Sequence, residues 1–196
     1  MNYSNKAVPR TQRGYSLVEI MAVFAMVAIV AAVAVPMMTT AIRESRLNSA
    51  HNFVTMEIRR ARQAAVDFRR IHRLSVDAQG TITLARQEMP SRDWTVLKSE
   101  SLPAGIVFAT PTGAPGGDSS PDGLGDDAVS FGGGNVVFFR PDGSARDQIG
   151  EIVNGIVYVS SEAHPERGKA VTLLGSTGRV KAWVLAENED GSVEWK

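Results

Sequence analysis

The amino-acid sequence predicts an α+β protein, in which a long N-terminal helix, first transmembrane and then amphipathic, packs on an antiparallel β-sheet head of one or two sheets. Three observations support this fold class. The chain contains one long uncharged apolar segment, then a segment with helical apolar periodicity, and then many short apolar runs separated by turn residues. A helix and a sheet that each have one apolar face bury those faces against each other.

The apolar segment lies between Glu19 and Arg43. The 23 positions between these two residues carry no charge and are mostly Ala, Val, Ile and Met. An α-helix rises about 1.5 Å per residue, and the hydrocarbon core of a bilayer is about 30 Å thick, so this segment is long enough to cross it. We therefore expect a transmembrane helix over residues 15–40.

The segment before the apolar residues is basic. Residues 1–14 contain Lys6, Arg10 and Arg13 and no acid, and the positive-inside tendency keeps such a segment in the cytoplasm. A secretory signal has its small-residue cleavage site after the apolar region, whereas Gly14 precedes it here. Cleavage at Gly14 would remove residues 1–14 as a cytoplasmic leader peptide and leave the membrane span attached to the rest of the chain.

Glu19 is an acid at the start of the membrane segment. An ionised carboxylate costs about 2.5 to 3.5 kcal/mol at the centre of a spanning helix and less towards the interface. One interpretation is that the Glu19 side chain only reaches the lipid headgroups. The position of Gly14, five residues upstream and immediately before the apolar run, favours a specific role instead.

These residues together resemble the N-terminus of a type IV prepilin or a type II secretion pseudopilin. The signature of these proteins is a short basic leader, a glycine, the first mature residue and a glutamate at the fifth mature position. Here the corresponding residues are Lys6 to Arg13, Gly14, Tyr15 and Glu19. Tyr15 stands where phenylalanine is commoner, and Pro36 matches a proline that such helices often carry.

The resemblance implies processing followed by assembly. A prepilin peptidase cuts between Gly14 and Tyr15 and methylates the new amine, which removes 14 of the 196 residues and leaves 182. The mature single-pass chain then stays in the inner membrane, with its N-terminus cytoplasmic and its head periplasmic. It later joins other pilins or pseudopilins through the N-terminal helix, where Glu19 compensates the terminal amine of a neighbouring subunit.

Residues 41–74 predict the amphipathic part of the helix. Apolar side chains recur there at every third or fourth residue, and no Gly or Pro interrupts them. This spacing places them on one helical face, which we expect to pack on the head. The residues of this face are Leu47, Ala50, Val54, Ile58, Ala61, Ala65 and Phe68.

Residues 75–196 predict a β-rich head with a single core. Short runs of β-branched and aromatic residues, separated by turn residues, are typical of antiparallel strands. The segment Pro141 to Gly143 has Pro, Asp and Gly at the positions where a tight turn favours each of them. The expected strands, the first of which overlaps the end of the helical segment, cover residues 72–77, 81–86, 94–98, 105–109, 136–140, 156–160, 170–174 and 179–185.

Residues 111–127 are nearly all Pro, Gly, Ser or Asp. They offer too little apolar surface to offset the entropy cost of ordering, so we expect a disordered surface loop. Carboxylates at close spacing could bind Ca²⁺, but those of this loop lack the spacing of a known calcium loop. We therefore expect solvated acids here, and no metal or cofactor. The acids are Asp118, Asp122, Asp126 and Asp127.

The formal net charge of zero conceals an uneven distribution. Residues 43–73 contain eight Arg against three acids, whereas the chain after residue 73 contains 17 acids against ten bases. A basic stem and an acidic head favour electrostatic association with neighbouring molecules, although such surfaces are also often simply solvated. The absence of cysteine excludes disulfides and thiolate metal sites.

Two segments of the head resemble the GspH/FimT group of minor pseudopilins and minor pilins. In that group an F-x-P-D-G hairpin and a C-terminal G-R-x-basic strand recur. The matching residues here are Phe139 to Gly143 and Gly178 to Lys181. The resemblance implies a minor subunit of a type II secretion system or a type IV pilus, incorporated into a thin filament or initiating or capping it.

DNA binding is an alternative function, because the G-R-x-basic motif of the FimT branch is associated with it. Residues two apart in a strand point to the same side, so Arg179 and Lys181 would share one face. Lys181 stands where arginine is more usual, and its ammonium lacks the fork geometry of a guanidinium. Two cations still form only a small footprint for a DNA partner.

The sequence offers little for catalysis. It contains no G-x-S-x-G elbow, no P-loop and no H-E-x-x-H motif, which are arrangements that common enzyme chemistries require. We expect its three histidines, His51, His72 and His164, on the surface rather than as catalytic bases. The chain is therefore predicted to be no enzyme, and a single-pass periplasmic enzyme or sensor is the weakest alternative.

Overall fold

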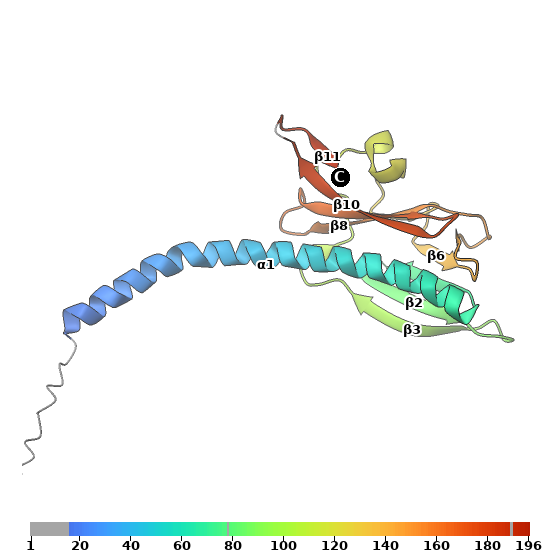
Figure 1. The fold of residues 1–196 in the computed structure, drawn as a ribbon, viewed down its shortest axis with the longest axis horizontal. Coiled ribbons are helices and arrows are strands. Elements are labelled where there is room, and N and C mark those ends of the chain that lie inside the picture. Colours follow the sequence, from blue (N-terminus) through green and yellow to red (C-terminus); the bar gives the residue numbers. More distant parts are fainter. Residues whose placement is uncertain (1–15, 78, 189) are drawn as a thin grey trace, which may run out of the picture. The chain divides into compact units, whose positions relative to one another are not determined.

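A computed structural model of the chain describes residues 16–77, 79–188 and 190–196. The chain forms two compact units, one that ends at Ile42 and one from Arg43 to Lys196. Helix α1 (Leu17–Phe68) contributes to both of them (Figure 1).

In the first unit, α1 is apolar and exposed. The side chains described between Leu17 and Ile42 are all exposed, and the large apolar ones among them have exposed fractions of 41 to 76 %. By length and composition this part of α1 can cross a membrane. The apolar segment is therefore helical, and no described part of the chain covers its apolar surface.

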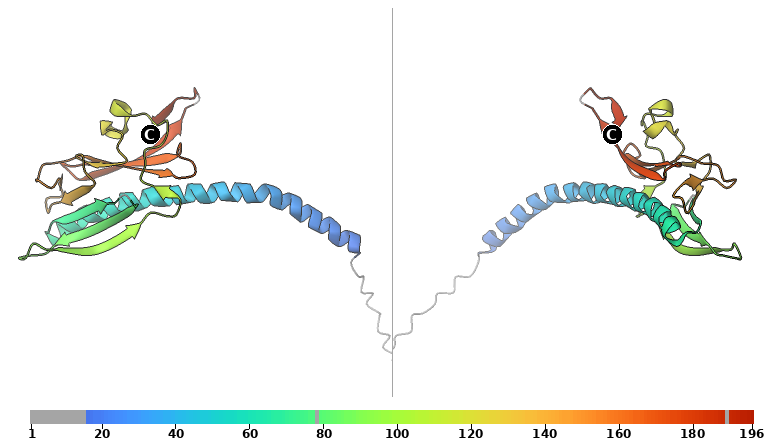
Figure 2. Two further views of the ribbon diagram at one scale, coloured as in Figure 1. Left: turned by 180° about the vertical axis from the view of Figure 1, so that it is seen from behind. Right: turned by 45° about the vertical axis from the view of Figure 1, so that its right-hand side comes forward.

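In the second unit, α1 packs on the head with its predicted apolar face. The six predicted residues from Leu47 to Ala65 are at most 3 % exposed, which confirms this face. Phe68, the last residue of the predicted face, is instead 59 % exposed. Figure 2 shows from two further directions how both sheets of the head lie against this part of the helix.

Helix α1 ends at Phe68, earlier than the predicted residue 74. Arg69 has a φ of 51°, and the backbone N–H groups of Arg69 and Arg70 donate to Val66 O and Ala65 O, both at 3.3 Å. This is the Schellman arrangement that closes many helices, usually with glycine at the left-handed position. Because an arginine occupies that position here, the sequence carried no local signal for the helix end.

The head contains two antiparallel sheets, which confirms the predicted fold class. We call the first one sheet I, with strand order β3-β2-β1-β6-β7. In the turn between its first two strands, the Asp77 carboxylate accepts the N–H groups of Gln79 and Thr81, and Gly80 has a φ of 84°. Its strands are β1 (His72–Val76), β2 (Thr81–Gln87), β3 (Trp94–Ser101), β6 (Val136–Phe139) and β7 (Ala145–Arg146).

Sheet II has the strand order β11-β10-β9-β8-β4, and β5 also pairs with β8. The register of its long hairpin places Arg179 opposite Leu174 and Lys181 opposite Thr172. Its strands are β4 (Ile106–Val107), β5 (Val129–Phe131), β8 (Gly155–Ser161), β9 (Gly168–Leu174), β10 (Arg179–Glu187) and β11 (Val193–Trp195).

Within residues 16–77, 79–188 and 190–196, all eight predicted strands are present, and three more were not predicted. The additional strands β5, β7 and β11 contain only two or three residues each. Runs of this length are too short to show an alternating pattern. Their pairing depends on the longer strands beside them.

One apolar core joins α1 to both sheets. It contains Val54 and Ile58 from the helix, Leu74 and Val137 from sheet I, and buried residues from β8 and β9 of sheet II. A second, smaller cluster covers the other face of sheet II. It consists of Ile156, Tyr158 and Ala170, with Leu124, Trp183 and Trp195 packed against them.

The expectation of a disordered loop at residues 111–127 needs correction. The segment contains two short 3₁₀ turns, η1 (Gly117–Ser119) and η2 (Pro121–Gly123). The Tyr158 hydroxyl donates to Gly125 O at 2.8 Å, and the Trp195 indole donates to Pro115 O at 3.2 Å. Aromatic side chains of β8 and β11 thus supply the apolar and polar contacts that the segment itself lacks. Burial of the Tyr158 hydroxyl raises the pKa of Tyr158 to about 12.

Candidate functional site

The predicted N-terminal site lies only partly within the described residues. Gly14 and Tyr15 lie outside them. Glu19 lies in the first turn of α1, is exposed, and donates its backbone N–H to Ser16 O at 3.0 Å. A carboxylate is favourable at this end of a helix, because the helix dipole is positive there.

The predicted C-terminal pair, Arg179 and Lys181, lies at the start of β10. Both side chains are exposed, whereas Val180 between them is half-buried and packs on the main core. Alternation along the strand therefore places the two cations on the outer side of sheet II, as predicted. Their surroundings differ.

Lys181 already has partners within the chain. Its ammonium lies 3.3 Å from the centre of the Trp183 ring and 3.9 Å from Asp122 Oδ1. Asp122 is held in turn by the Thr172 hydroxyl, which also accepts the Trp183 indole N–H at 3.0 Å. An aspartate of the 111–127 segment thus partly neutralises Lys181, which weakens any role of this lysine in attracting an external anion.

Arg62 on α1 brings the two sequence motifs of the head together. Its Nε donates to Gly143 O at 3.3 Å and to Thr177 O at 3.1 Å. The first carbonyl belongs to the predicted turn of the F-x-P-D-G hairpin, in which Gly143 N–H also donates to Arg140 O at 2.9 Å. The second belongs to the turn between β9 and β10. One helical side chain therefore binds both turns to α1.

Gly178 is required where these groups meet. It has a φ of 65°, which favours glycine. A Cβ at this position would also collide with the Arg62 side chain and with Gly143 O. The glycine of the G-R-x-basic motif thus has a structural reason, because it lets the β9–β10 turn approach the helix.

A buried acid fixes the neighbouring part of α1. Glu57 is 3 % exposed, and its Oε1 lies 2.7 Å from Lys98 Nζ and 3.0 Å from Arg60 Nη1. The hydrogen bond that Lys98 donates to Glu57 is the main cause that raises the pKa of Lys98. The lysine of β3 and the acid of α1 therefore form a charged link between sheet I and the helix.

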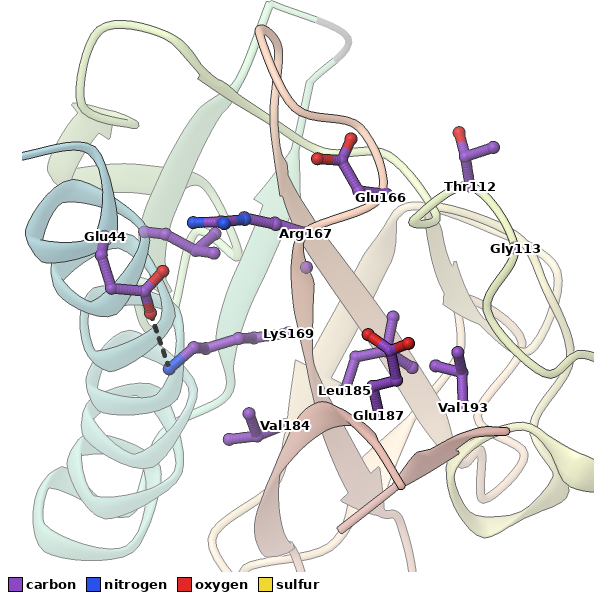
Figure 3. A pocket seen from close by; sticks show the side chains of 12 residues that line it. Glu44, Thr112, Gly113, Glu166, Arg167, Lys169, Val184, Leu185, Glu187 and Val193 are labelled. Atoms are coloured by element: carbon purple, nitrogen blue, oxygen red, sulfur yellow. Dashed lines mark ion pairs between the residues drawn. The ribbon is translucent and has the colours of Figure 1, made fainter. Parts of the chain in front are cut away.

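A cavity of about 490 Å³ lies where α1, β9, β10 and residues 112–113 meet (Figure 3). Lys169 lines it, 3.9 Å from Glu44 Oε1, and also donates to Asn48 Oδ1. Glu166, Glu187 and Arg167 also line it, so that three carboxylates and two cations face the cavity. Since cations and carboxylates share the same walls, the cavity has no strong charge of one sign and we assign no charged ligand to it.

Two of the four acids of residues 111–127 make contacts within the chain. Asp126 Oδ1 accepts the Gly117 N–H at 2.9 Å, and Asp122 faces Thr172 and Lys181. Within the part of the chain that the structure describes, no three His, Asp or Glu residues form a group that could hold a metal ion.

Two of the three histidines are buried, contrary to the expectation from the sequence. His51 is 7 % exposed and its Nε2 lies 3.1 Å from Ala170 O, whereas His72 is 0 % exposed and its Nδ1 lies 3.1 Å from Arg70 O. Burial lowers the pKa of both rings. The bond of His51 joins α1 to β9, whereas that of His72 lies within the connection between α1 and β1.

Arg59 and Arg62, which meet the β9–β10 hairpin, were not predicted as site residues; in the sequence they belong only to the basic surplus of residues 43–73. Their spacing of three along α1 was a weak signal, because it places two guanidiniums near one helical face. The strand that they meet lies more than a hundred residues further along the chain.

Comparison with known proteins gives one match in sequence and several in structure. Residues 9–35 match the family model of the prokaryotic N-terminal methylation motif, which confirms the type IV prepilin-like N-terminus. A search of curated proteins gave no significant match.

Two solved structures illustrate what the fold is similar to. The minor pseudopilin EpsH from the type 2 secretion system of Vibrio cholerae is 9 % identical, with a TM-score of 0.49, over 71 % of this chain and 97 % of EpsH. The type IV minor pilin FimU of Pseudomonas aeruginosa is 12 % identical, with a TM-score of 0.46, over 70 % of this chain and 88 % of FimU.

Proposed function

We propose that this chain is a minor pilin or minor pseudopilin, a non-enzymatic subunit of a thin filament in a type IV pilus or a type II secretion system. The observation that carries the proposal is the N-terminal methylation motif at residues 9–35. It is followed within one helix by apolar side chains that remain exposed up to Ile42. A leader of this kind and a helix without its own cover fit a subunit that is processed, held in a membrane and then packed against other subunits.

The proposed topology follows from the same segment. The basic leader stays in the cytoplasm, α1 crosses the inner membrane up to about residue 40, and the head from residue 41 onward lies in the periplasm. Prepilin peptidase removes residues 1–14 and methylates Tyr15. In the filament, Glu19 compensates the terminal amine of a neighbouring subunit, and α1 packs against the helices of other pilins or pseudopilins.

The test is the intact mass of the protein purified from membranes of cells that contain a prepilin peptidase. We expect a chain that begins at a methylated Tyr15, and we expect Gly14→Glu to retain the leader, because a side chain at the cleavage position obstructs the peptidase. Asn5→Glu adds the same acid to the leader away from the junction and should be processed normally. An unshortened wild-type chain in these cells would contradict the proposal.

The DNA-binding alternative through Arg179 and Lys181 has less support. Lys181 is 3.9 Å from Asp122 and stacked on Trp183, so only Arg179 of the pair is available to a phosphate. A single phosphate contact supplies little of the electrostatic affinity that DNA binding needs. If Arg179 nevertheless binds phosphates, a single-stranded DNA should compete with an acidic peptide for the same cation.

A further inference from the structure

A cavity of about 480 Å³ lies between α1 and the start of β10. Four arginines line it, together with Gln63, Gly178 and Val180. Within this lining, all of which the structure describes, there is no aspartate or glutamate. The four are Arg59, Arg60, Arg62 and Arg179.

Only one of these four guanidiniums has a carboxylate partner among the described residues. Arg60 lies 3.0 Å from Glu57. Arg62 donates to two backbone carbonyls, and Arg59 reaches Val180 O at 3.5 Å. The Arg179 side chain is exposed and forms no ion pair within the described residues. Like charges held this close repel one another, so an anion placed among them would be bound favourably.

The same cavity lies beside an unpaired strand edge. β11 pairs only with residues 185–187 of β10, and the last edge contacts are the two hydrogen bonds between Val184 and Lys196. Backbone groups of an antiparallel strand alternate in direction, so those of Val180 and Ala182 point to the same side as those of Val184. The bond from Arg59 to Val180 O agrees with this direction. The N–H groups of Val180 and Ala182 therefore lie on an edge that no strand of the described residues pairs with.

From these two features we infer that the Val180–Ala182 edge and its arginines bind an extended acidic segment of another pilin or pseudopilin subunit. The backbone of that segment adds as a strand to the edge of β10. Its carboxylates enter the cavity and pair with Arg179 and Arg59, and guanidiniums bind carboxylates through paired hydrogen bonds. The inference rests on the proposed filament role only for the source of the segment.

The geometry favours a peptide over a nucleic acid as the occupant. A strand edge offers alternating backbone donors and acceptors, which another peptide backbone matches and a sugar–phosphate chain does not. Asp122 lies beside Lys181, and its charge opposes a continuous run of phosphates along β10. A peptide with acids only at alternate positions can direct its carboxylates into the cavity that the arginines line and present only uncharged side chains on the side of Asp122.

The experiment measures peptide binding to the full processed chain in lipid nanodiscs by fluorescence anisotropy. The probe is a labelled ten-residue peptide in which Glu and Thr alternate. We expect it to bind at least about tenfold more tightly than the same peptide with Gln in place of Glu. The loss of one hydrogen-bonded charge pair already lowers the affinity by more than about tenfold. A probe with alternate backbone nitrogens methylated, which cannot pair with a strand edge, should also bind at least about tenfold more weakly.

Matched variants locate the site. Arg59→Gln combined with Arg179→Gln should weaken the Glu peptide by about tenfold or more, whereas Arg92→Gln combined with Arg140→Gln removes the same charge elsewhere on the head and should leave binding unchanged. Equal binding of the Glu and Gln peptides, or of the methylated and unmethylated ones, would overturn the inference. A single-stranded DNA of ten nucleotides would also overturn it, if the DNA displaced the labelled peptide at a concentration below the dissociation constant of the peptide. None of these results alters processing at Gly14, so the proposed function is tested independently.

Discussion

The two parts of helix α1 place similar side chains in opposite surroundings. Ile29, before Arg43, is 69 % exposed, whereas Ile58, after it, is 1 % exposed. Before Arg43, apolar residues occupy all sides of the helix; after it, arginines and other polar residues separate the apolar positions into one face. The head covers that face, whereas no described part of the chain covers the apolar surface before Arg43.

The difference shows that one helix has two separate sources of stability. A helix that is apolar on every side needs a lipid bilayer or other helices around it. A helix with one apolar face needs only a partner surface, which sheets I and II provide. We therefore expect changes before Arg43 to affect assembly and changes after it to affect folding of the head, and the following predictions test this separation.

Glu19→Ala should have the largest effect, and only on assembly. Removing one partner of an ion pair in a low-dielectric environment costs about 3 to 5 kcal/mol, so the variant should enter filaments at less than about a tenth of the normal level. Membrane insertion should not suffer, because the acid itself opposes insertion. The measurement is the amount of variant in sheared filaments relative to the membrane fraction. Glu44→Ala removes an acid from the same helix outside the span and should assemble normally; normal assembly of Glu19→Ala would assign Glu19 to the headgroups.

The matched pair Ile58→Ala and Ile29→Ala tests the comparison directly. Truncation of a buried isoleucine costs about 2 to 5 kcal/mol, whereas truncation of an exposed one leaves no cavity. All three tryptophans of the chain belong to the head, so tryptophan fluorescence during denaturation in nanodiscs reports head unfolding. We expect Ile58→Ala to lower the unfolding midpoint and Ile29→Ala to leave it unchanged. An equal loss in both would mean that the two parts of α1 are not separate.

Gly178→Ala should destabilise the head by a smaller amount. The left-handed conformation costs a non-glycine residue about 1 to 2 kcal/mol, and the new Cβ also collides with Arg62 and Gly143 O. Gly113→Ala is the control, because Gly113 has a φ of 78° but a Cβ at this position would have no neighbouring atom within 4 Å. Both variants carry the cost of a positive φ, so the difference between their unfolding free energies gives the cost of the collision alone. If they lose the same amount, close approach of the turn to α1 is not what requires Gly178.

The smallest expected effect is a pH dependence of head stability. Burial lowers the folded-state pKa of His51 and His72 below the ordinary value of 6.5. The unfolded chain therefore binds more protons in this range, so the stabilisation is complete above pH 6.5 and decreases as the pH falls towards the folded pKa values. The midpoint of thermal unfolding should fall on acidification from pH 7.5 to about 5. His51→Gln should reduce this slope more than His164→Gln, and equal slopes would contradict the assignment to His51.

The sequence by itself determined the features that local patterns encode. The uncharged run after Glu19 determined a membrane-length helix, and the spacing from Leu47 to Ala65 determined its buried face. The Pro141 to Gly143 turn and the eight predicted strands followed from turn residues and β-branched runs. These features could be predicted because each depends on residues within one or two turns or strands of each other.

Tertiary structure alone decided what depends on distant residues. Arg69 ends α1 in a conformation that favours glycine, and His72 then pairs with two strands, so a helical pattern could not reveal the boundary. Tyr158 and Trp195 bind a Gly- and Pro-rich segment whose composition alone predicted disorder. Likewise, Arg179 and Lys181 are two residues apart, yet Asp122 lies beside Lys181. The fold brings the 111–127 segment to that part of β10. Contacts of this kind have no sequence period, since chain separation and spatial distance are unrelated once the core has formed.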